Sequence, residues 1–341
     1  MGRVRVLIVG VGGTIASVAT SRGVAPGMGA AEILEKALRG KLPAGIEVDI
    51  LNLMMVDSSL MRPEDWVKIA TTIYEKYRDY DSFLVLHGTD TMAYTAAALA
   101  FSLRGLRKPV ALTGSMKTLE ESGTDVPKNL WDSLVFSREA PKLGLSGVYI
   151  VFYGKVILGV RASKVSTASV DAFTSVNYPY IARVSGEEVA VEHRPSRRVE
   201  GKLKLEASFD RSIAVLKAFP GIRADLIEAL LSAGVRGIVV ESFGLGGLPE
   251  ELIAKLSKIS SKVPVVVTSQ PTYGGVDLEV YEVGRRLLDS GVIPAYDMSK
   301  EAATVKLMWV LGKLPGLAGE ELVHRVKDEV LRNYEDEIKT S

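Results

Sequence analysis

Two short segments of this chain each place a threonine just beyond an apolar, β-forming run. Residues 12–16 carry Thr14, and residues 87–91 carry Thr89 with Asp90 directly beside it. Ligands of an open parallel sheet bind outside the carboxyl ends of the strands, so the two hydroxyl groups can converge on one substrate. A single threonine after a strand is more typical of a helix cap. The repetition, together with the adjacent carboxylate, favours catalysis by hydroxyl groups.

The composition excludes several other chemistries. There is no cysteine, so disulfides, thiol nucleophiles and cysteine metal sites are ruled out, which fits a reducing compartment. The three histidines are far apart in sequence and show no metal-ligand spacing, so no metal site is predicted. His87 ends an apolar run and is interpreted as a packed, hydrogen-bonded core residue. A catalytic hydroxyl group must then be activated by lysine, aspartate or tyrosine.

Charge and hydropathy restrict the partners. The 42 basic and 41 acidic residues nearly balance, which predicts no nucleic-acid partner. No apolar run reaches the roughly 18 residues that a membrane span needs, so no membrane association is expected. Residues 3–19 resemble a signal peptide, but cleavage there would remove Thr14, and we expect a cytoplasmic protein. Scarce amides, four Asn and one Gln, indicate a thermophilic source.

Strand-like and helix-like segments alternate along the first half of the chain. This alternation is typical of βαβ units and predicts an α/β fold with a doubly wound parallel sheet. The predicted strands are 4–9, 48–53, 83–86, 110–112, 148–152 and 155–162, and the predicted helices are 30–38, 63–77, 92–103 and 130–137.

A chain of 341 residues exceeds the usual size of one hydrophobic core, so two domains are expected. Polar sequence with Pro and Gly marks a linker at 186–210, between an N-terminal domain (1–185) and a smaller C-terminal α/β domain (211–341). The second domain is predicted to contain strands 213–218, 237–242 and 263–269, and helices 224–233, 249–257, 281–288, 301–311 and 320–334.

A dinucleotide site is a weak alternative for the first glycine-rich turn. Residues 10–15 supply two glycines of a GxGxxG pattern, but Ile15 stands where the third glycine would allow close helix packing. No helix follows at once to receive a pyrophosphate.

Five segments together resemble cytoplasmic, type I L-asparaginases of the archaeal kind. In order, they are Gly-Gly-Thr-Ile-Ala at 12–16, Asp-Ser-Ser at 57–59, His-Gly-Thr-Asp-Thr-Met-Ala-Tyr-Thr at 87–95, Thr-Gly-Ser-Met at 113–116 and Gly-Val-Arg-Ala-Ser-Lys at 159–164. The resemblance implies a flavodoxin-like, doubly wound parallel sheet domain followed by a smaller α/β domain. It also implies at least a homodimer, for which the apolar loop 242–247 is a candidate contact.

The resemblance implies hydrolysis of L-asparagine to L-aspartate and ammonia. Thr14 matches the nucleophile, which would form an acyl-enzyme ester with the side-chain amide carbon. Thr89, Asp90 and Lys142 match a second triad, in which the lysine accepts a proton through the threonine. Such a lysine must be neutral part of the time, and Asp90 opposes this, so Asp90 is expected to orient the lysine or to bind the substrate α-amine.

Substrate binding is assigned by the same resemblance to Asp57, Ser58 and Ser59 for the α-amino and α-carboxylate groups. Backbone N–H groups around Gly88 and Ser115 would form the oxyanion hole. The scheme needs no metal or cofactor.

One departure from the family pattern is a missing tyrosine in the loop after the nucleophile, where Val24 stands instead. Tyr273, in the turn 270–275, is a candidate to supply the missing phenol. Two alternatives stay open: the asparaginase-like subunit of the archaeal glutamyl-tRNA(Gln) amidotransferase, and a non-catalytic amino-acid sensor.

Overall fold

Short runs rich in Val, Leu and Ile form the central strands of the first unit, Met1–Ala207. A computed structural model of the protein describes residues 2–20, 23–197, 199 and 201–339. Helices cover both faces of the sheet, which explains why these strands are almost continuously apolar. The parallel strands are β1 (Val4–Gly12), β4 (Ile46–Val56), β5 (Ser82–Leu86), β7 (Pro109–Thr113) and β8 (Gly147–Phe152).

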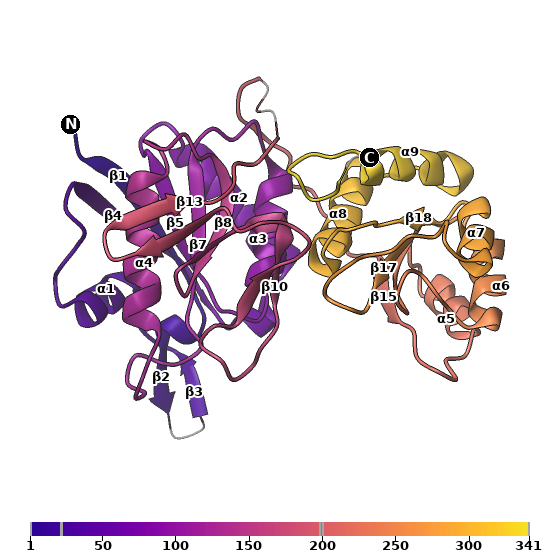
Figure 1. Cartoon of the computed structure of the whole chain (residues 1–341), viewed down its shortest axis with the longest axis horizontal. Helices are drawn as coiled ribbons and strands as arrows, with labels where there is room; N and C mark the ends of the chain where they lie inside the picture. The colour runs from indigo at the N-terminus through magenta and orange to yellow at the C-terminus, as the bar shows by residue number, and fades with distance from the viewer. Residues whose placement is uncertain (1, 21–22, 198, 200, 340–341) are drawn as a thin grey trace. The chain divides into compact units, whose positions relative to one another are not determined.

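The order of these strands across the sheet is β4-β1-β5-β7-β8, which is the flavodoxin-like order (Figure 1). The predicted fold class is therefore confirmed. Helices α1 (Ala30–Leu38) and α4 (Val126–Glu139) pack together, as do α2 (Pro63–Lys76) and α3 (Met92–Ser102). The chain reverses its direction of winding between β1 and β5, so the switch point of the sheet lies between their carboxyl ends.

Three antiparallel strands extend the sheet beyond β8. They are β9 (Lys155–Leu158), β12 (Ala182–Ser185) and β13 (Glu188–Val191). The strand predicted at 155–162 is shorter because a 3₁₀ turn, Gly159–Arg161, follows β9. Residues 188–191 were expected in the linker, but they form a hairpin with β12 around Gly186, whose φ is 60°.

The described residues of the first unit also form three small two-stranded sheets. The hairpin of β2 (Ser17–Thr20) and β3 (Gly23–Pro26) occupies the stretch that was expected to be a loop. The other pairs are β10 (Ala162–Lys164) with β11 (Phe173–Ser175), and β6 (Leu103–Arg104) with β14 (Lys204–Leu205).

The second unit, Ser208–Ser341, has its own parallel sheet. The boundary between the units lies within the stretch 186–210. The strands are β15 (Ile213–Lys217), β16 (Gly237–Ser242), β17 (Val265–Ser269) and β18 (Ile293–Pro294). The helices are α5 (Leu226–Ser232), α6 (Glu250–Ile259), α7 (Glu282–Asp289), α8 (Lys300–Lys313) and α9 (Gly319–Leu331). Within the described residues, no helix combines the length and the apolar character that crossing a bilayer requires.

Candidate active site

Two glycines turn the chain at the end of β1. Gly12 and Gly13 have φ values of 107° and 85°, in the region that favours glycine. A Cβ on Gly12 would lie 2.5 Å from the backbone of Val56, the last residue of β4. The N–H of Gly13 donates to the Val56 carbonyl over 3.1 Å. These contacts place Thr14 beside the start of the 57–59 segment.

Gly88 brings three of the sequence motifs together. A Cβ on Gly13 would lie 2.2 Å from Gly88 N and Cα, so these two backbones are in direct contact. A Cβ on Gly88 would lie 2.5 Å from Ser58 Oγ. Thr14 and Thr89 each follow one of the touching glycines, so the two threonines lie at one place, the switch point of the sheet.

The 57–59 segment forms a tight polar turn at this place. Asp57 Oδ1 accepts hydrogen bonds of 2.8 Å from both the N–H and the hydroxyl group of Ser59. Ser58 is buried, whereas Asp57 and Ser59 are exposed. The Thr91 hydroxyl group donates to the Ser58 carbonyl over 2.8 Å and so ties this turn to the 87–91 segment. An exposed carboxylate held this way can receive a substrate ammonium group.

Lys164 is the lysine that joins the second threonine. Its Nζ lies 2.8 Å from Thr89 Oγ1 and 2.7 Å from Asp90 Oδ1. Thr89 is buried, the Lys164 side chain is 16% exposed and that of Asp90 is 62% exposed. A protonated lysine has only donors, so it fixes the Thr89 oxygen and leaves the hydroxyl proton free to point elsewhere.

The prediction that Lys142 joins Thr89 and Asp90 is wrong in its geometry. Lys142 Nζ pairs with Glu139 Oε1 over 2.9 Å, and its side chain is 42% exposed. Lys142 follows α4, which returns the chain to the edge where β8 begins, away from the edge where β5 ends. Lys164 is the last residue of the family-like segment 159–164, so the motif itself was the signal that could have identified this lysine.

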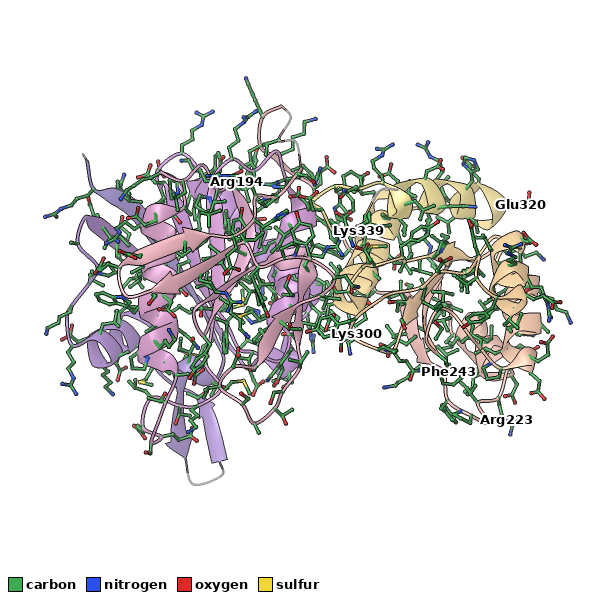
Figure 2. All side chains as sticks on the ribbon, in the orientation of Figure 1. Arg194, Arg223, Phe243, Lys300, Glu320 and Lys339 are labelled. Carbon is green, nitrogen blue, oxygen red and sulfur yellow. The ribbon has the colours of Figure 1, made fainter. Side chains whose placement is uncertain are left out.

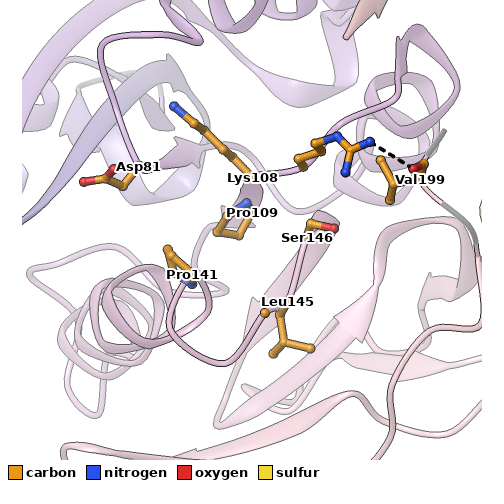
Figure 3. Close-up of a pocket in the computed structure, with 9 residues that line it drawn as sticks. Asp81, Lys108, Pro109, Pro141, Leu145, Ser146 and Val199 are labelled. Carbon is orange, nitrogen blue, oxygen red and sulfur yellow. Dashed lines mark hydrogen bonds between the residues drawn. The ribbon is translucent and has the colours of Figure 1, made fainter. Parts of the chain in front are cut away.

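A cavity of about 300 Å³ marks the edge of the sheet to which Lys142 belongs. Figure 3 shows its lining, which includes Asp81, Lys108, Pro109, Pro141 and Ser146. These residues precede or begin strands, or follow α4, and none of them is a predicted site residue. This hollow is therefore not where the threonines meet.

Ser115 lies in the turn after β7, and this turn also reaches the threonine site. A Cβ on Gly114 would lie 2.2 Å from the His87 carbonyl oxygen and 3.4 Å from Thr89 Cγ2. Ser115 is fully buried, and its hydroxyl group donates to the Lys117 carbonyl over 2.7 Å. Its side chain is thus committed within the turn, which leaves its backbone as the part that can meet a substrate.

His87 supports the site without acting as a base. Its Nδ1 lies 2.7 Å from the Gly88 carbonyl oxygen, so this nitrogen donates, and Nε2 accepts from the Thr95 hydroxyl group over 2.9 Å. Complete burial lowers the pKa of His87 to about 4, while the bond to Gly88 opposes the shift. The imidazole is therefore neutral near neutral pH, as expected for a core residue.

Val24 belongs to β3, but its side chain lies outside the described residues. The hairpin is anchored at its base, where Gly27 N and Met28 N both donate to the Ala16 carbonyl over 2.8 Å. The described residues contain no group of three His, Asp or Glu side chains arranged to hold a metal ion.

Fold and site together define a two-domain α/β protein with a hydroxyl-based site at the switch point of its larger sheet. Residues 5–197 match the profile of the asparaginase N-terminal domain, and residues 212–321 match that of the glutaminase/asparaginase C-terminal domain. The chain belongs to the asparaginase family, as its sequence motifs indicate.

Individual relatives agree with this assignment. The chain is 44% identical to the L-asparaginase of Thermococcus kodakarensis, over 90% of this chain and 93% of that protein. The solved structure of the thermostable L-asparaginase from the same organism superposes with a TM-score of 0.90 at 40% identity, covering 99% of this chain and all of the other. One component of the glutamyl-tRNA(Gln) amidotransferase of T. kodakarensis is 37% identical over 98% of this chain and 76% of its own length.

Proposed function

We propose that this protein is an asparaginase that hydrolyses L-asparagine to L-aspartate and ammonia through a threonine acyl-enzyme. The Oγ of Thr14 attacks the side-chain amide carbon, the C–N bond breaks and ammonia leaves. Water then attacks the ester carbon, and aspartate and the Thr14 hydroxyl group are released. In each step one proton moves between Thr14 Oγ and the leaving or attacking group, so the reaction balances without a cofactor.

In our proposal, the transfer of that proton depends on three residues, Thr89, Asp90 and Lys164. The Lys164 ammonium donates to Thr89 Oγ1 and Asp90 Oδ1, which fixes the oxygen of Thr89 and leaves its proton for transfer. The hydroxyl group of Thr89 can then take one proton as it gives another, which makes it a shuttle. Lys164 thus takes the position beside Thr89 that the sequence had suggested for Lys142, but it acts as a hydrogen-bond donor and not as the proton acceptor.

Asp57, Ser58 and Ser59 would bind the charged α-groups of the substrate. The exposed Asp57 carboxylate suits the α-ammonium, and the Ser59 N–H and hydroxyl group hold that carboxylate in place over 2.8 Å each. Backbone groups at Gly88 and Ser115 would face the amide that reacts. Gly88 suits this position because a side chain there would collide with Ser58.

The single observation that carries the proposal is the pair of Lys164 bonds, and a matched pair of variants tests it. Lys164→Met removes the ammonium at the threonine site, whereas Lys142→Met removes one at the opposite edge of the sheet. We expect kcat for ammonia release from L-asparagine to fall at least about a thousandfold in the first and to stay unchanged in the second. Equal activity of the two variants would contradict the proposal.

The amidotransferase component is the second candidate, because 98% of this chain aligns with it. Purified protein should release ammonia from L-asparagine without any partner protein if our proposal holds. Ammonia release that appears only with a partner protein would favour the second candidate. Binding of aspartate without any turnover would indicate a sensor.

We also propose a cytoplasmic homodimer. In the second unit, a cavity of about 540 Å³ is lined by Phe243, Leu245, Leu248 and Tyr281, among others. Phe243, labelled in Figure 2, and Leu245 are 37% and 38% exposed, and Tyr281 is 63% exposed. An apolar surface of this kind fits contact with a second copy. Sedimentation of wild-type protein and of a Phe243→Ser variant tests the assignment, since only the wild type should dimerise.

A further inference from the structure

The turn that carries Ser115 is held by a carboxylate from a different element. Asp125 Oδ2 accepts from Met116 N over 2.9 Å, and Asp125 Oδ1 accepts from Lys117 N over 3.1 Å. Asp125 is only 3% exposed. Two consecutive backbone N–H groups just after Ser115 are therefore occupied by one buried side chain.

Asp125 stands at the N-cap of α4, yet its side chain makes no capping bond to that helix. An Asp at this position normally accepts from the first free N–H groups of its own helix, which stabilises the helix by about 1 kcal/mol. Here the carboxylate serves the 116–117 backbone instead. A cap given up in this way indicates that holding the turn is the residue's role.

Asn129 completes the clamp from one turn further along α4. Its Nδ2 donates to the Gly114 carbonyl and to Asp125 Oδ2, both over 2.9 Å, and its Oδ1 accepts from Tyr153 N over 2.9 Å. Asn129 is fully buried. The residues before and after Ser115 are thus both fixed to the start of α4.

None of these bonds involves the backbone N–H or C=O group of Ser115 itself. Among the described residues, its N–H and C=O have no hydrogen-bond partner, although the residue is fully buried. Buried backbone groups are almost always paired. The neighbouring Gly114 packs on His87 and Thr89, so the Ser115 peptide borders the place where the amide of a substrate would react.

We propose that Asp125, with Asn129, is a positioning residue for catalysis: the clamp holds the Ser115 peptide in the geometry that the reacting amide requires. This inference rests on the proposed function and deepens it. A displacement of about 1 Å in such a group can lower the rate about a hundredfold without loss of the substrate's other contacts. The effect should therefore appear in kcat and much less in KM.

The experiment compares Asp125→Ala and Asp125→Asn with Asp132→Asn in the full-length protein. Asp132 is a matched control because it is a buried carboxylate of α4, 2% exposed, whose partners are Lys128 and the backbone of Gly154 rather than the turn. We expect kcat to fall about a hundredfold in Asp125→Ala and about tenfold in Asp125→Asn, with KM within about threefold. In Asp125→Asn, the new side chain retains one oxygen that can accept from the N–H groups of the turn. Its NH₂ group, however, replaces an oxygen that accepted hydrogen bonds. Asp132→Asn should keep the wild-type kcat.

Amide hydrogen exchange provides a readout that does not depend on the reaction. The N–H groups of Met116 and Lys117 should be protected in the wild type and in Asp132→Asn, and should exchange faster in both Asp125 variants. Equal kcat values in the Asp125 and Asp132 variants would overturn the inference, as would unchanged exchange. If Asp125→Ala does not fold, Asp125→Asn carries the test. Wild-type protein that releases no ammonia would instead refute the proposed function, and the exchange data would still report on the clamp.

Discussion

Acid should destabilise this protein through His87 before it protonates most of the carboxylates. The imidazole is fully buried, with a pKa lowered from 6.5 to about 4, mainly because burial disfavours the charged form. In the unfolded chain the same group would take up a proton near pH 6.5. Between these two values the unfolded state binds more protons, so stability falls as the pH falls.

The size of the effect follows from the two pKa values. At about 1.36 kcal/mol for each pH unit, the interval from 6.5 to about 4 corresponds to about 3 kcal/mol. This stability is fully present above pH 6.5 and is lost as the pH falls through the folded-state pKa of about 4. A loss of about 2.5 kcal/mol is expected by about pH 4.5.

Urea unfolding at about pH 7.5 and about pH 4.5 measures this loss in wild type and in His87→Asn. The variant keeps a donor for the Gly88 carbonyl but cannot titrate, so its free energy of unfolding should depend less on pH by about 2.5 kcal/mol. His324→Gln is the control for the loss of a histidine, because the His324 side chain is 78% exposed, so comparing the two variants isolates the effect of burial at His87. An equally steep loss of stability in His87→Asn would refute the reasoning.

Three further predictions concern packing, a buried ion pair and a candidate phenol. Gly88→Ala places a Cβ 2.5 Å from Ser58 Oγ and 3.0 Å from Gly13 Cα, so we expect kcat to drop. Gly247→Ala is the control and should keep the wild-type kcat, because its Cβ would lie 3.6 Å from the nearest neighbouring atom. Lys306→Met leaves the Glu337 carboxylate buried without its cation, with the N–H groups of Tyr334 and Glu335 as its remaining donors, since both side chains of the pair are 0% exposed. Denaturant titration should show a loss of about 3–5 kcal/mol, and partly restored stability in Lys306→Met/Glu337→Gln, which removes the charge but keeps an oxygen for these N–H groups, would confirm the cause. Tyr273→Phe removes only the hydroxyl group of a residue that is 59% exposed, and an unchanged kcat would exclude Tyr273 as the substitute for the family's loop tyrosine.

Elements that bury a continuous apolar face could be predicted well from the sequence. The predicted helix 30–38 coincides with α1, and the predicted strand 237–242 coincides with β16. In both cases the local pattern of apolar residues already contains the reason for the structure, which is burial against a sheet or between helices.

Short strands with distant or partly exposed partners could not be predicted. Strand β13 alternates between exposed and half-buried residues, and only its pairing with β12 makes it part of the sheet. Strand β10 has three residues and depends on β11 for its hydrogen bonds. The stability of such strands comes from the partner, which a short window of sequence does not include.

The topology of the sheet predicts where the two threonines lie, but it does not predict which lysine joins them. Thr14 and Thr89 follow parallel strands that flank the switch point, so the rule for open sheets brings them to the same edge. The same rule argues against Lys142, because a residue between a crossover helix and the next parallel strand lies at the opposite edge.

That rule does not predict the position of Lys164. It comes after the antiparallel strand β9, which carries the chain away from the catalytic edge. A Cβ on Gly159 would lie 3.2 Å from Ala96 Cβ, so the chain meets α3 one turn inside that helix. From there β10 leads it back to Thr89, two residues before Thr91 at the N-cap of α3. Because this return path is no βαβ unit, no handedness or edge rule describes it. Only the packing of the 159–164 segment on α3 determines which lysine reaches the second threonine.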